Sequence, residues 1–436
     1  MKNLILVLVI FFVNINYTQN KKTFFESPKD IYYISSDLHI HTVFSDGAVW
    51  PTIRVDEAIR DSIDLISLTE HLEYQSHLSD IPHTNRNRSF QIAGGYVQNR
   101  PLAVVHGTEI TKPMPPGHFN AIFIQDANKF FDKNKEPLEF IKGIKEANDQ
   151  EAFVFWNHPM WEANRSDGIV KLDPIHQEII DKKLLHGIEV VNFDTFSEEA
   201  MQIALDNNLT MMGTSDVHIL IAWDFNIEKE SFHRPITFIM SNNRTMNSIR
   251  DALFNGDTFI WYRDLIIGKS NNLKQVIDNN LEVISKGYSY RDRKVEILQI
   301  ELKNKSVAPI NLNYTGEYTF HNDYKFINLE PKSSKTIYVK TKKIKQKVDL
   351  EFDVDSLRIR DLADDPEYKQ VDKQRSTIYD SLKQTSKVSA GGGTPSDARP
   401  EVPDPRKGDT IGKVKANVEG GKLRQLLNEL HSDEEQ

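Results

Sequence analysis

The chain of 436 residues contains no cysteine. Disulfide bonds are therefore excluded, and so is lipid attachment through a cysteine that follows a leader segment. A protein without disulfides must depend on a large hydrophobic core, and this length predicts two or three domains with enough chain to build one. Bound metal ions would add stability to such a protein by mass action.

Positive charge is also scarce. The chain has 54 lysines and arginines against 63 aspartates and glutamates, which gives a formal net charge of -9. Proteins that capture DNA or RNA present a basic surface to the phosphate backbone. The composition therefore argues against nucleic acid as a partner.

Long apolar runs are absent after the N-terminus, so no later segment is expected to span a membrane. Residues 1–19 are typical of a secretory signal peptide, with Lys2 as the positive charge, an apolar segment from Leu4 to Val13 and a polar cleavage region. The apolar segment is too short to span a bilayer. We expect a periplasmic or secreted protein, with an uncleaved N-terminal anchor as the alternative, because the cleavage region lacks the usual small residues.

Histidines and carboxylates gather in five short clusters, each beside an apolar run typical of a β-strand. Successive side chains of a strand point to opposite faces, so His39 and His41 project to the same side and can bind one cation. The clusters are Asp37-Leu38-His39-Ile40-His41-Thr42 with Ser45-Asp46-Gly47, Thr69-Glu70-His71, Gly107-Thr108-Glu109 with His118, Asn157-His158-Pro159, and Ser215-Asp216-Val217-His218.

Together these clusters offer nine candidate metal ligands: His39, His41, Asp46, His71, Glu109, His118, His158, Asp216 and His218. Imidazole suits zinc, iron and manganese, and carboxylates add oxygen ligands that can bridge two ions. Nine ligands exceed what one tetrahedral ion needs. We therefore expect two to three divalent metal ions (Zn, Mn or Fe) that share ligands, an arrangement that polarises a phosphoryl oxygen and supplies hydroxide at neutral pH.

The other histidines lie outside the clusters and are expected to be structural or surface residues. Two of them, His77 and His83, lie in the polar segment after the second cluster and could reach the mouth of the site. The full set is His77, His83, His106, His176, His186, His233, His321 and His431.

The five clusters, in this order, resemble the PHP family, named for polymerase and histidinol phosphatase domains. The similarity covers residues 31 to 265. It implies a distorted (β/α)7 barrel with a trinuclear metal centre at the C-terminal ends of the barrel strands. It also implies catalysis by a metal-bound hydroxide with no side-chain nucleophile, and the chain has no Gly-x-Ser-x-Gly element.

The resemblance assigns the ligands to three metals: His39, His41, Glu109 and Asp216 to the first, Glu109 as a bridge with His118 and His158 to the second, and Asp46, His71 and His218 to the third. Glu70 departs from the family pattern, which more often has aspartate before the motif histidine. This neighbour usually supports the ligands without binding metal.

Alternating strand and helix patterns fit an α/β barrel over residues 31–268. Every ligand cluster falls at or just after a predicted strand, as expected for the C-terminal mouth of a barrel. The predicted strands are Ile63–Leu68, Leu102–His106, Phe119–Ile124, Phe153–Trp156, Ile188–Val191, Met211–Met212, Arg234–Met240 and Thr258–Tyr262. The predicted helices are Pro51–Ser62, Pro137–Asn148, Asp173–Leu185, Ser197–Asn207 and Thr245–Phe254.

A small β-sandwich is predicted over residues 285–356, where apolar and polar residues alternate, as in Ile310, Leu312 and Tyr314. We expect it to serve as a packing or oligomerisation module. From residue 361 to 436 the chain is polar and is predicted to be a disordered tail. Within that tail, the leucine spacing of residues 422–431 predicts a short amphipathic helix.

The sequence thus predicts a secreted metal-dependent phosphoesterase acting on a small phosphorylated substrate, either a phosphomonoester or a phosphodiester. Arg234 and Arg165 are the candidates to bind the phosphate. One alternative is amidohydrolase-like hydrolysis of a non-phosphate substrate, since those barrels also begin with a His-x-His strand but usually bridge two metals with a modified lysine. The other is a non-catalytic metal-binding module.

Overall fold

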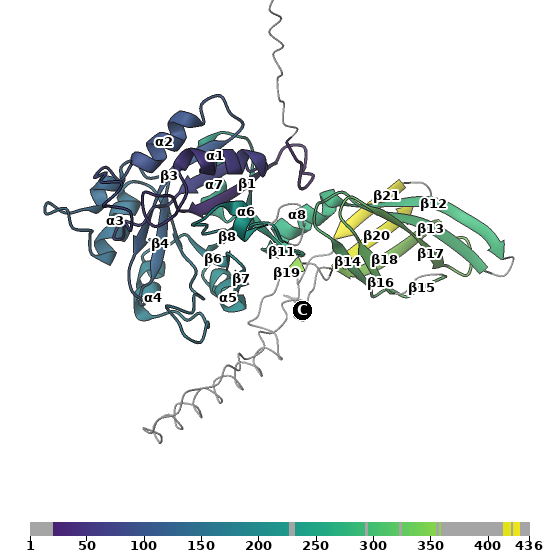
Figure 1. Cartoon of the computed structure of the whole chain (residues 1–436). Helices are drawn as coiled ribbons and strands as arrows, with labels where there is room; N and C mark the ends of the chain where they lie inside the picture. Colours follow the sequence, from purple (N-terminus) through teal and green to yellow (C-terminus); the bar gives the residue numbers. More distant parts are fainter. Residues whose placement is uncertain are drawn as a thin grey trace, which may run out of the picture.

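The computed structural model describes residues 21–225, 232–292, 295–321, 325–354, 357–358, 413–419 and 422–427. The signal peptide predicted over residues 1–19 lies outside these ranges. Figure 1 shows a larger α/β body and a smaller β body, with helix α8 (Ser270–Asn280) between them. In the described part of the chain, no helix combines the length and the apolar character that crossing a membrane requires.

The larger body is built on one curled, mixed sheet of twelve strands, in the order β19-β11-β10-β9-β1-β2-β3-β4-β5-β6-β7, with β8 paired to β6. Strand β1 pairs parallel with β2 and antiparallel with β9. The sheet curls so far that Ile40, at the end of β1, forms a bridge with Val217, just after β8. This is the distorted barrel that the sequence predicts.

The strands of this sheet are β1 (Tyr32–Ile40), β2 (Leu65–Leu68), β3 (Ala103–Thr111), β4 (His118–Ile122), β5 (Phe153–Trp156), β6 (Gly187–Asn192), β7 (Thr195–Phe196), β8 (Thr210–Thr214), β9 (Ile236–Ser241), β10 (Thr258–Tyr262), β11 (Leu265–Gly268) and β19 (Leu357–Arg358).

The predicted helices are confirmed with small shifts of their ends, and α1 begins at the predicted proline, Pro51, which a first helical turn tolerates. Helices α2 and α8 have no counterpart in the sequence prediction. The helices of the larger body are α1 (Pro51–Arg60), α2 (Arg88–Tyr96), η1 (Ala127–Phe130), α3 (Phe140–Asp149), α4 (Pro174–Asp181), α5 (Glu198–Asp206), α6 (Ile221–Asp224) and α7 (Met246–Asn255).

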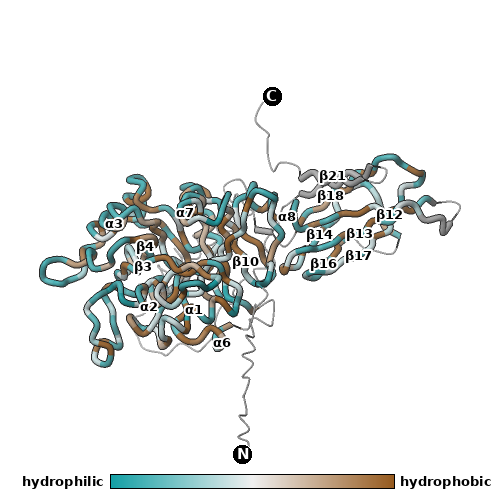
Figure 2. The backbone as a smooth tube through the Cα atoms, turned by 90° about the horizontal axis from the view of Figure 1, so that it is seen from above, coloured by the Kyte–Doolittle hydropathy of each residue, from teal (hydrophilic) through white to brown (hydrophobic). Residues whose placement is uncertain are grey.

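Apolar side chains concentrate on the strands, while the outlying loops are hydrophilic (Figure 2). Strand β1 is buried at every position after its first residue, as expected for a strand covered on both faces. The core runs without interruption from the larger body through α8 into the smaller one, because Leu273 and Val276 of α8 belong to the same buried cluster as Trp261 and Val283. The two bodies therefore share part of their core.

The smaller body consists of two antiparallel sheets, in the orders β12-β13-β17-β15 and β16-β14-β18-β20-β21. The predicted alternation is confirmed, because Ile310, Leu312 and Tyr314 of β14 are buried while the residues between them are partly exposed. Its strands are β12 (Leu281–Asp292), β13 (Val295–Asn304), β14 (Ile310–Tyr314), β15 (Thr319–Phe320), β16 (Phe326–Leu329), β17 (Ser334–Lys340), β18 (Lys347–Val354), β20 (Lys413–Glu419) and β21 (Lys422–Leu427).

The predicted C-terminal helix is wrong over residues 422–427. These residues form strand β21, which pairs antiparallel with β20, and β20 in turn pairs with β18. The edge of β18 offers free backbone donors and acceptors, and pairing with that edge outweighs a short helical pattern that has no packing partner of its own. Apart from β20 and β21, residues 361–436, predicted as a disordered tail, lie outside the described residues.

Candidate metal centre

The nine candidate ligands meet at one edge of the barrel sheet. His41, His71, His158 and Asp216 follow strands β1, β2, β5 and β8, whose carboxyl ends lie at that edge. His118 begins β4, which runs antiparallel to β3, so the start of β4 lies beside the end of β3 and Thr111 pairs with His118. Each of the nine belongs to at least one of four groups whose side-chain ligand atoms lie within 4.8 Å of one another.

Four ligand atoms drawn from two of these groups lie at nearly equal spacing. His39 Nε2 and His41 Nε2 are 3.1 Å apart, which confirms that the two imidazoles face the same side. Asp216 Oδ1 lies 3.1 Å from both nitrogens and Glu109 Oε2 lies 3.2 Å from both. Four ligands at about 2.0 Å from a tetrahedral ion would be separated by about 3.3 Å. The spacing of these atoms therefore fits a single central cation.

Glu109 uses its second oxygen for a different set of residues. Its Oε1 lies 2.8 Å from His118 Nδ1 and 3.8 Å from His158 Nε2. Asp216 Oδ2 is also 3.8 Å from His158 Nε2. One carboxylate thus faces two adjacent sets of nitrogen ligands, the arrangement of a carboxylate that bridges two ions.

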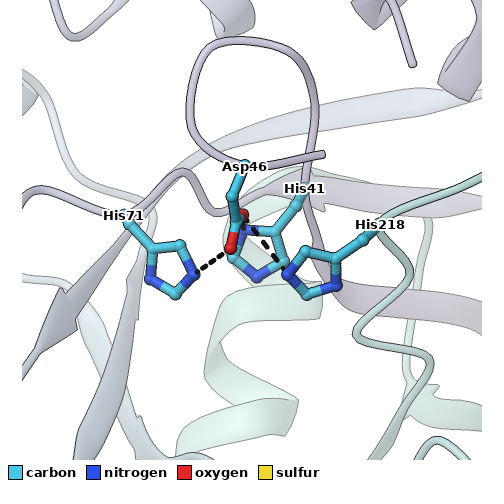
Figure 3. A group of neighbouring side chains, drawn as sticks. All are labelled: His41, Asp46, His71 and His218. Carbon is cyan, nitrogen blue, oxygen red and sulfur yellow. Dashed lines mark ion pairs between the residues drawn. The ribbon is translucent and has the colours of Figure 1, made fainter. Parts of the chain in front are cut away.

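A further group surrounds Asp46, in the loop after β1 (Figure 3). Asp46 Oδ2 lies 3.4 Å from His71 Nε2, and Asp46 Oδ1 lies 3.3 Å from His218 Nε2. The ring of His41 stacks between the other two, with centroids 4.5 Å from His71 and 4.3 Å from His218. His41 therefore joins this group to the one around His39.

The charges of the cluster compensate one another. Burial lowers the pKa of His39, but the negative charge of Asp216 and two buried glutamates outweighs it and holds the pKa well above the usual range. Burial likewise opposes the charged form of His71, yet Glu109 and Asp46 raise its pKa to about 9. The pKa of Glu109 lies well below the usual range despite burial, because His71 and His39 favour its charged form. In such a site, protons and metal cations compete for the same ligand atoms.

Two further observations fit bound cations. Glu109 Oε1, Asp216 Oδ1 and His118 Nδ1 are buried without a hydrogen-bond partner of good geometry among the described residues. Buried polar atoms are normally satisfied, and a metal ion would satisfy these. In addition, His158 and Asp216 have positive φ angles of 26° and 51°, a backbone region that costs non-glycine residues about 1–3 kcal/mol and that clusters at functional sites.

The loop that brings Asp46 over the cluster is fixed by Glu70. Its carboxylate accepts hydrogen bonds from Thr42 Oγ1 at 2.5 Å and from Ser45 Oγ at 2.6 Å. Gly47 completes the turn, because a Cβ there would lie 2.8 Å from the backbone of His41 and Thr42. Glu70 thus orients the loop without entering any of the four groups, which agrees with the supporting role expected for this position.

Glu189, on β6, is a residue of this site that the sequence analysis did not single out. It is fully buried, and its Oε1 lies 2.7 Å from His39 Nδ1. Because a carboxylate can only accept, His39 donates from Nδ1 and presents Nε2 to the cluster. The other oxygen accepts from the backbone N–H of His158 at 2.6 Å, so one glutamate orients two candidate ligands. A charged residue inside the apolar run Gly187–Asn192 was the available signal.

We expect Glu189→Gln to weaken metal binding about 10- to 100-fold, the usual effect of removing a carboxylate that supports a ligating histidine. The measurement is a metal titration against a chelating dye. Glu178→Gln, at an exposed ion pair with Lys182, serves as the control and should bind metal like the wild-type protein. Unchanged affinity in the Glu189 variant would contradict this role.

Arg54, on α1, joins two of the ligand-bearing loops. It is 1% exposed, and its guanidinium donates to the carbonyl oxygens of His41 (3.0 Å) and Val217 (3.1 Å). It also pairs with Glu57 at 2.8 Å, and Glu57 accepts from the N–H of Ile221. The loops after β1 and β8 are therefore tied to one helix.

The predicted role of Arg234 in substrate binding finds no support in its contacts. Its side chain is buried and forms ion pairs with Asp37 and Asp61, and Asp37 in turn accepts from Ser215 Oγ at 2.6 Å. Arg234 therefore supports the loop that begins at Ser215 and does not face a ligand. Arg165 is paired with Asp173 at 2.5 Å, and its contact with substrate stays a prediction.

The histidines outside the clusters are mostly engaged elsewhere. His106 stacks on Phe90, and burial lowers its pKa to about 4. His233 stacks on Trp261, and burial also lowers its pKa to about 4. These contacts support the structural role expected for both. His77 Nε2 lies 3.1 Å from the carbonyl oxygen of Gly47, so it contacts the loop of Asp46 without entering a ligand group.

The chain is similar to proteins of known structure. A family model described as an Ig-like domain (DUF5001) matches residues 281–361, which include strands β12 to β18. A two-domain protein from Bacteroides vulgatus ATCC 8482, containing a predicted PHP-like metal-dependent phosphoesterase, is 34% identical with a TM-score of 0.70. That similarity covers 78% of this chain and 96% of the other. No curated protein sequence matches the chain.

Two other solved structures are more distant. A candidate metal-dependent phosphoesterase from Bifidobacterium adolescentis ATCC 15703 is 16% identical, with a TM-score of 0.33, over 42% of this chain and 87% of its own. An amidohydrolase from Chromobacterium violaceum with bound sulfate and no metal is also 16% identical, with a TM-score of 0.31 over the same shares. At these scores neither similarity supports an argument about function.

Proposed function

Because the chain belongs to the family of PHP-like metal-dependent phosphoesterases, we propose that it hydrolyses a small phosphorylated substrate, a phosphomonoester or phosphodiester, at a centre of two to three divalent cations (Zn, Mn or Fe). In the reaction, the P–O bond to an alcohol breaks, water supplies the new oxygen on phosphorus, and the alcohol leaves with a proton. The nine residues of the four groups are the proposed ligands.

The observation on which the proposal depends most is the use of both oxygens of Glu109. Oε2 faces His39 and His41, and Oε1 faces His118. A carboxylate shared in this way brings two cations close enough to act on the same phosphoryl group. When bound, such cations polarise phosphoryl oxygens and lower the pKa of a coordinated water. No side-chain nucleophile is needed for this chemistry.

The protein side chains supply position and charge. Glu189 fixes the ring of His39, Glu70 fixes the loop of Asp46, and Arg54 ties the loops that bear His41 and His218. Asp46, Glu109 and Asp216 neutralise cations that would otherwise repel one another at short range. These residues therefore prearrange the site before a substrate enters.

The test is the metal content of the purified protein, combined with hydrolysis of p-nitrophenyl phosphate and bis-p-nitrophenyl phosphate. We expect two to three metal ions per chain, turnover of at least one ester, loss of that turnover with a chelator, and recovery when Mn or Zn is added back. The relative rates on the two esters assign monoesterase or diesterase activity. Protein without metal, or metal-loaded protein inactive on both esters, would contradict the proposal.

The same assay separates the alternatives. An amidohydrolase-like enzyme would hydrolyse an acyl p-nitroanilide with the metal bound, and a non-catalytic module would bind metal without turnover on any substrate. The two oxygens of Glu109 face different sets of candidate ligands, the position that a modified lysine takes in those barrels. This favours the phosphoesterase over a site bridged by a modified lysine.

We also propose that the protein is periplasmic or secreted. The support is the charge and apolar pattern of residues 1–19, which is typical of a signal peptide. The Ig-like domain is proposed as a packing or oligomerisation module, since the four ligand groups all lie in the larger body. Comparing the N-terminus of the mature protein with the encoded one tests the first point.

A further inference from the structure

Two exposed aromatic side chains flank the candidate metal centre. Trp161 is 48% exposed, and its ring packs in T-shaped geometry against His118 and His158, with centroids 5.8 and 5.2 Å apart. Tyr74 is 53% exposed and contacts His71, with centroids 6.3 Å apart. Large aromatic surfaces left open to water beside a ligand cluster indicate a binding surface.

Both aromatic residues are held by the segments that bear the ligands. Trp161 follows His158 in a turn closed by a hydrogen bond from Trp161 N to His158 O at 2.9 Å. Next to Tyr74, Glu73 accepts from the backbone N–H of Thr111 at 2.8 Å. Each ring is therefore kept near the ligand histidines and does not lie on a separate surface loop.

Two cations near these rings are already paired. Lys112 pairs with Glu73 at 2.7 Å, and Arg165 pairs with Asp173 at 2.5 Å. A leaving group with its own negative charge would find neither cation free to bind it. Trp161 and Tyr74 offer exposed ring surface beside the candidate ligands, and such surface suits an uncharged planar ring.

We propose that Trp161 and Tyr74 bind the leaving group of the substrate, and that this leaving group contains an uncharged planar ring. The inference rests on the proposed phosphoester hydrolysis and adds the class of ester to it. The phosphoryl group would lie at the metal ligands, and the ring would lie against one or both aromatic side chains. An aryl group and a nucleobase share this chemistry.

The test compares benzyl phosphate with isobutyl phosphate, because both are esters of primary alcohols and differ mainly in the ring. We expect the metal-loaded protein to prefer the benzyl ester about tenfold or more in kcat/KM, the size of effect that stacking on one aromatic side chain produces. Trp161→Ala and Tyr74→Ala should each reduce this preference, measured as the ratio of kcat/KM for the two esters. Trp161→Phe should keep most of it.

The ratio of the two esters does not depend on how much of a variant is folded or metal-loaded, so partial unfolding cannot imitate the result. Phe326→Ala, at a 51% exposed aromatic residue of β16 in the Ig-like domain, is the matched control and should keep the wild-type ratio. Adenosine 5′-monophosphate is tested as a third substrate, because a comparison of its kcat/KM with that of benzyl phosphate separates a nucleobase from a simple aryl ring.

Binding of benzylphosphonate and isobutylphosphonate, which are not hydrolysed, separates failure of this inference from failure of the proposed function. Turnover of neither ester, together with tighter binding of benzylphosphonate that is lost in Trp161→Ala, would overturn the phosphoesterase and support the ring site. Equal binding of both phosphonates, or a ring preference that survives in the Trp161→Ala, Tyr74→Ala double variant, would overturn the ring site.

Discussion

Glu109→Gln is expected to reduce turnover by at least about a thousandfold, because bound metal ions contribute several kcal/mol to the stabilisation of transition-state charge. The substitution keeps the shape of the side chain and removes the charge that faces His39 and His41 on one side and His118 on the other. Metal content should fall by one or two ions per chain, because the amide cannot bridge two cations.

The measurements are elemental analysis and kcat/KM on the preferred ester. Glu151→Gln, at a surface residue that pairs with Arg250 at 3.5 Å, is the control and should retain both metal and activity. A Glu109 variant with full metal content and undiminished activity would show that the bridging assignment is incorrect. Circular dichroism of both variants establishes that the fold is retained.

Arg54→Met is expected to lower the free energy of unfolding by about 3–5 kcal/mol, the cost of removing one partner from a buried ion pair. It leaves the carboxylate of Glu57 buried without its cation, the carbonyl oxygen of His41 loses the Arg54 donor, and that of Val217 keeps the N–H of His41 alone. The two loops that these carbonyls belong to also bear candidate ligands, so metal affinity should fall as well.

Denaturant unfolding of the protein with and without chelator measures both effects. Arg100→Met is the matched control. Arg100 pairs with Asp56 of α1, the helix that bears Arg54, but at a largely exposed position, where an ion pair contributes about 1 kcal/mol or less. If Arg54→Met were no more destabilising than Arg100→Met, the buried contacts of Arg54 would not be important for stability.

The candidate ligands could be predicted from the sequence because each lies in a short segment at or beside the end of a strand. A pair such as His39 and His41 already specifies a shared face through the two-residue period of a strand, and the structure places their nitrogens 3.1 Å apart. The parallel strands formed by the apolar runs end at one edge of the sheet, and the cluster forms at that edge. Here the local sequence pattern and the topology of the barrel indicate the same positions for the ligands.

The supporting residues could not be predicted in this way, because their roles depend on contacts between distant segments. Glu189 is a single carboxylate in an apolar strand, and only the curl of the sheet brings it to His39. Arg54 looks like an ordinary polar residue of an amphipathic helix, yet it is buried, and one of its partners, Val217, is 163 residues away in the sequence. Arg234 shows the reverse case, because the sequence suggested that it binds substrate, whereas its side chain forms a buried ion pair with Asp37.

The C-terminal strand was missed for a different reason. A six-residue segment with leucines at mixed spacing fits a helix and a strand almost equally well. What distinguishes them is the neighbouring edge of β18, to which β20 and then β21 add. Such an edge becomes visible only once the whole sandwich has been assembled.

The topology of the sheet also determines when the metal centre can form. His39 lies on β1 and Asp216 follows β8, and the bridge between Ile40 and Val217 joins the two regions only after every intervening strand has been added. A chain still emerging from the ribosome would therefore have His39 and His41 without their most distant partner. Complete metal loading must then follow synthesis and, for an exported protein that crosses the membrane unfolded, must take place with the ions available on the far side.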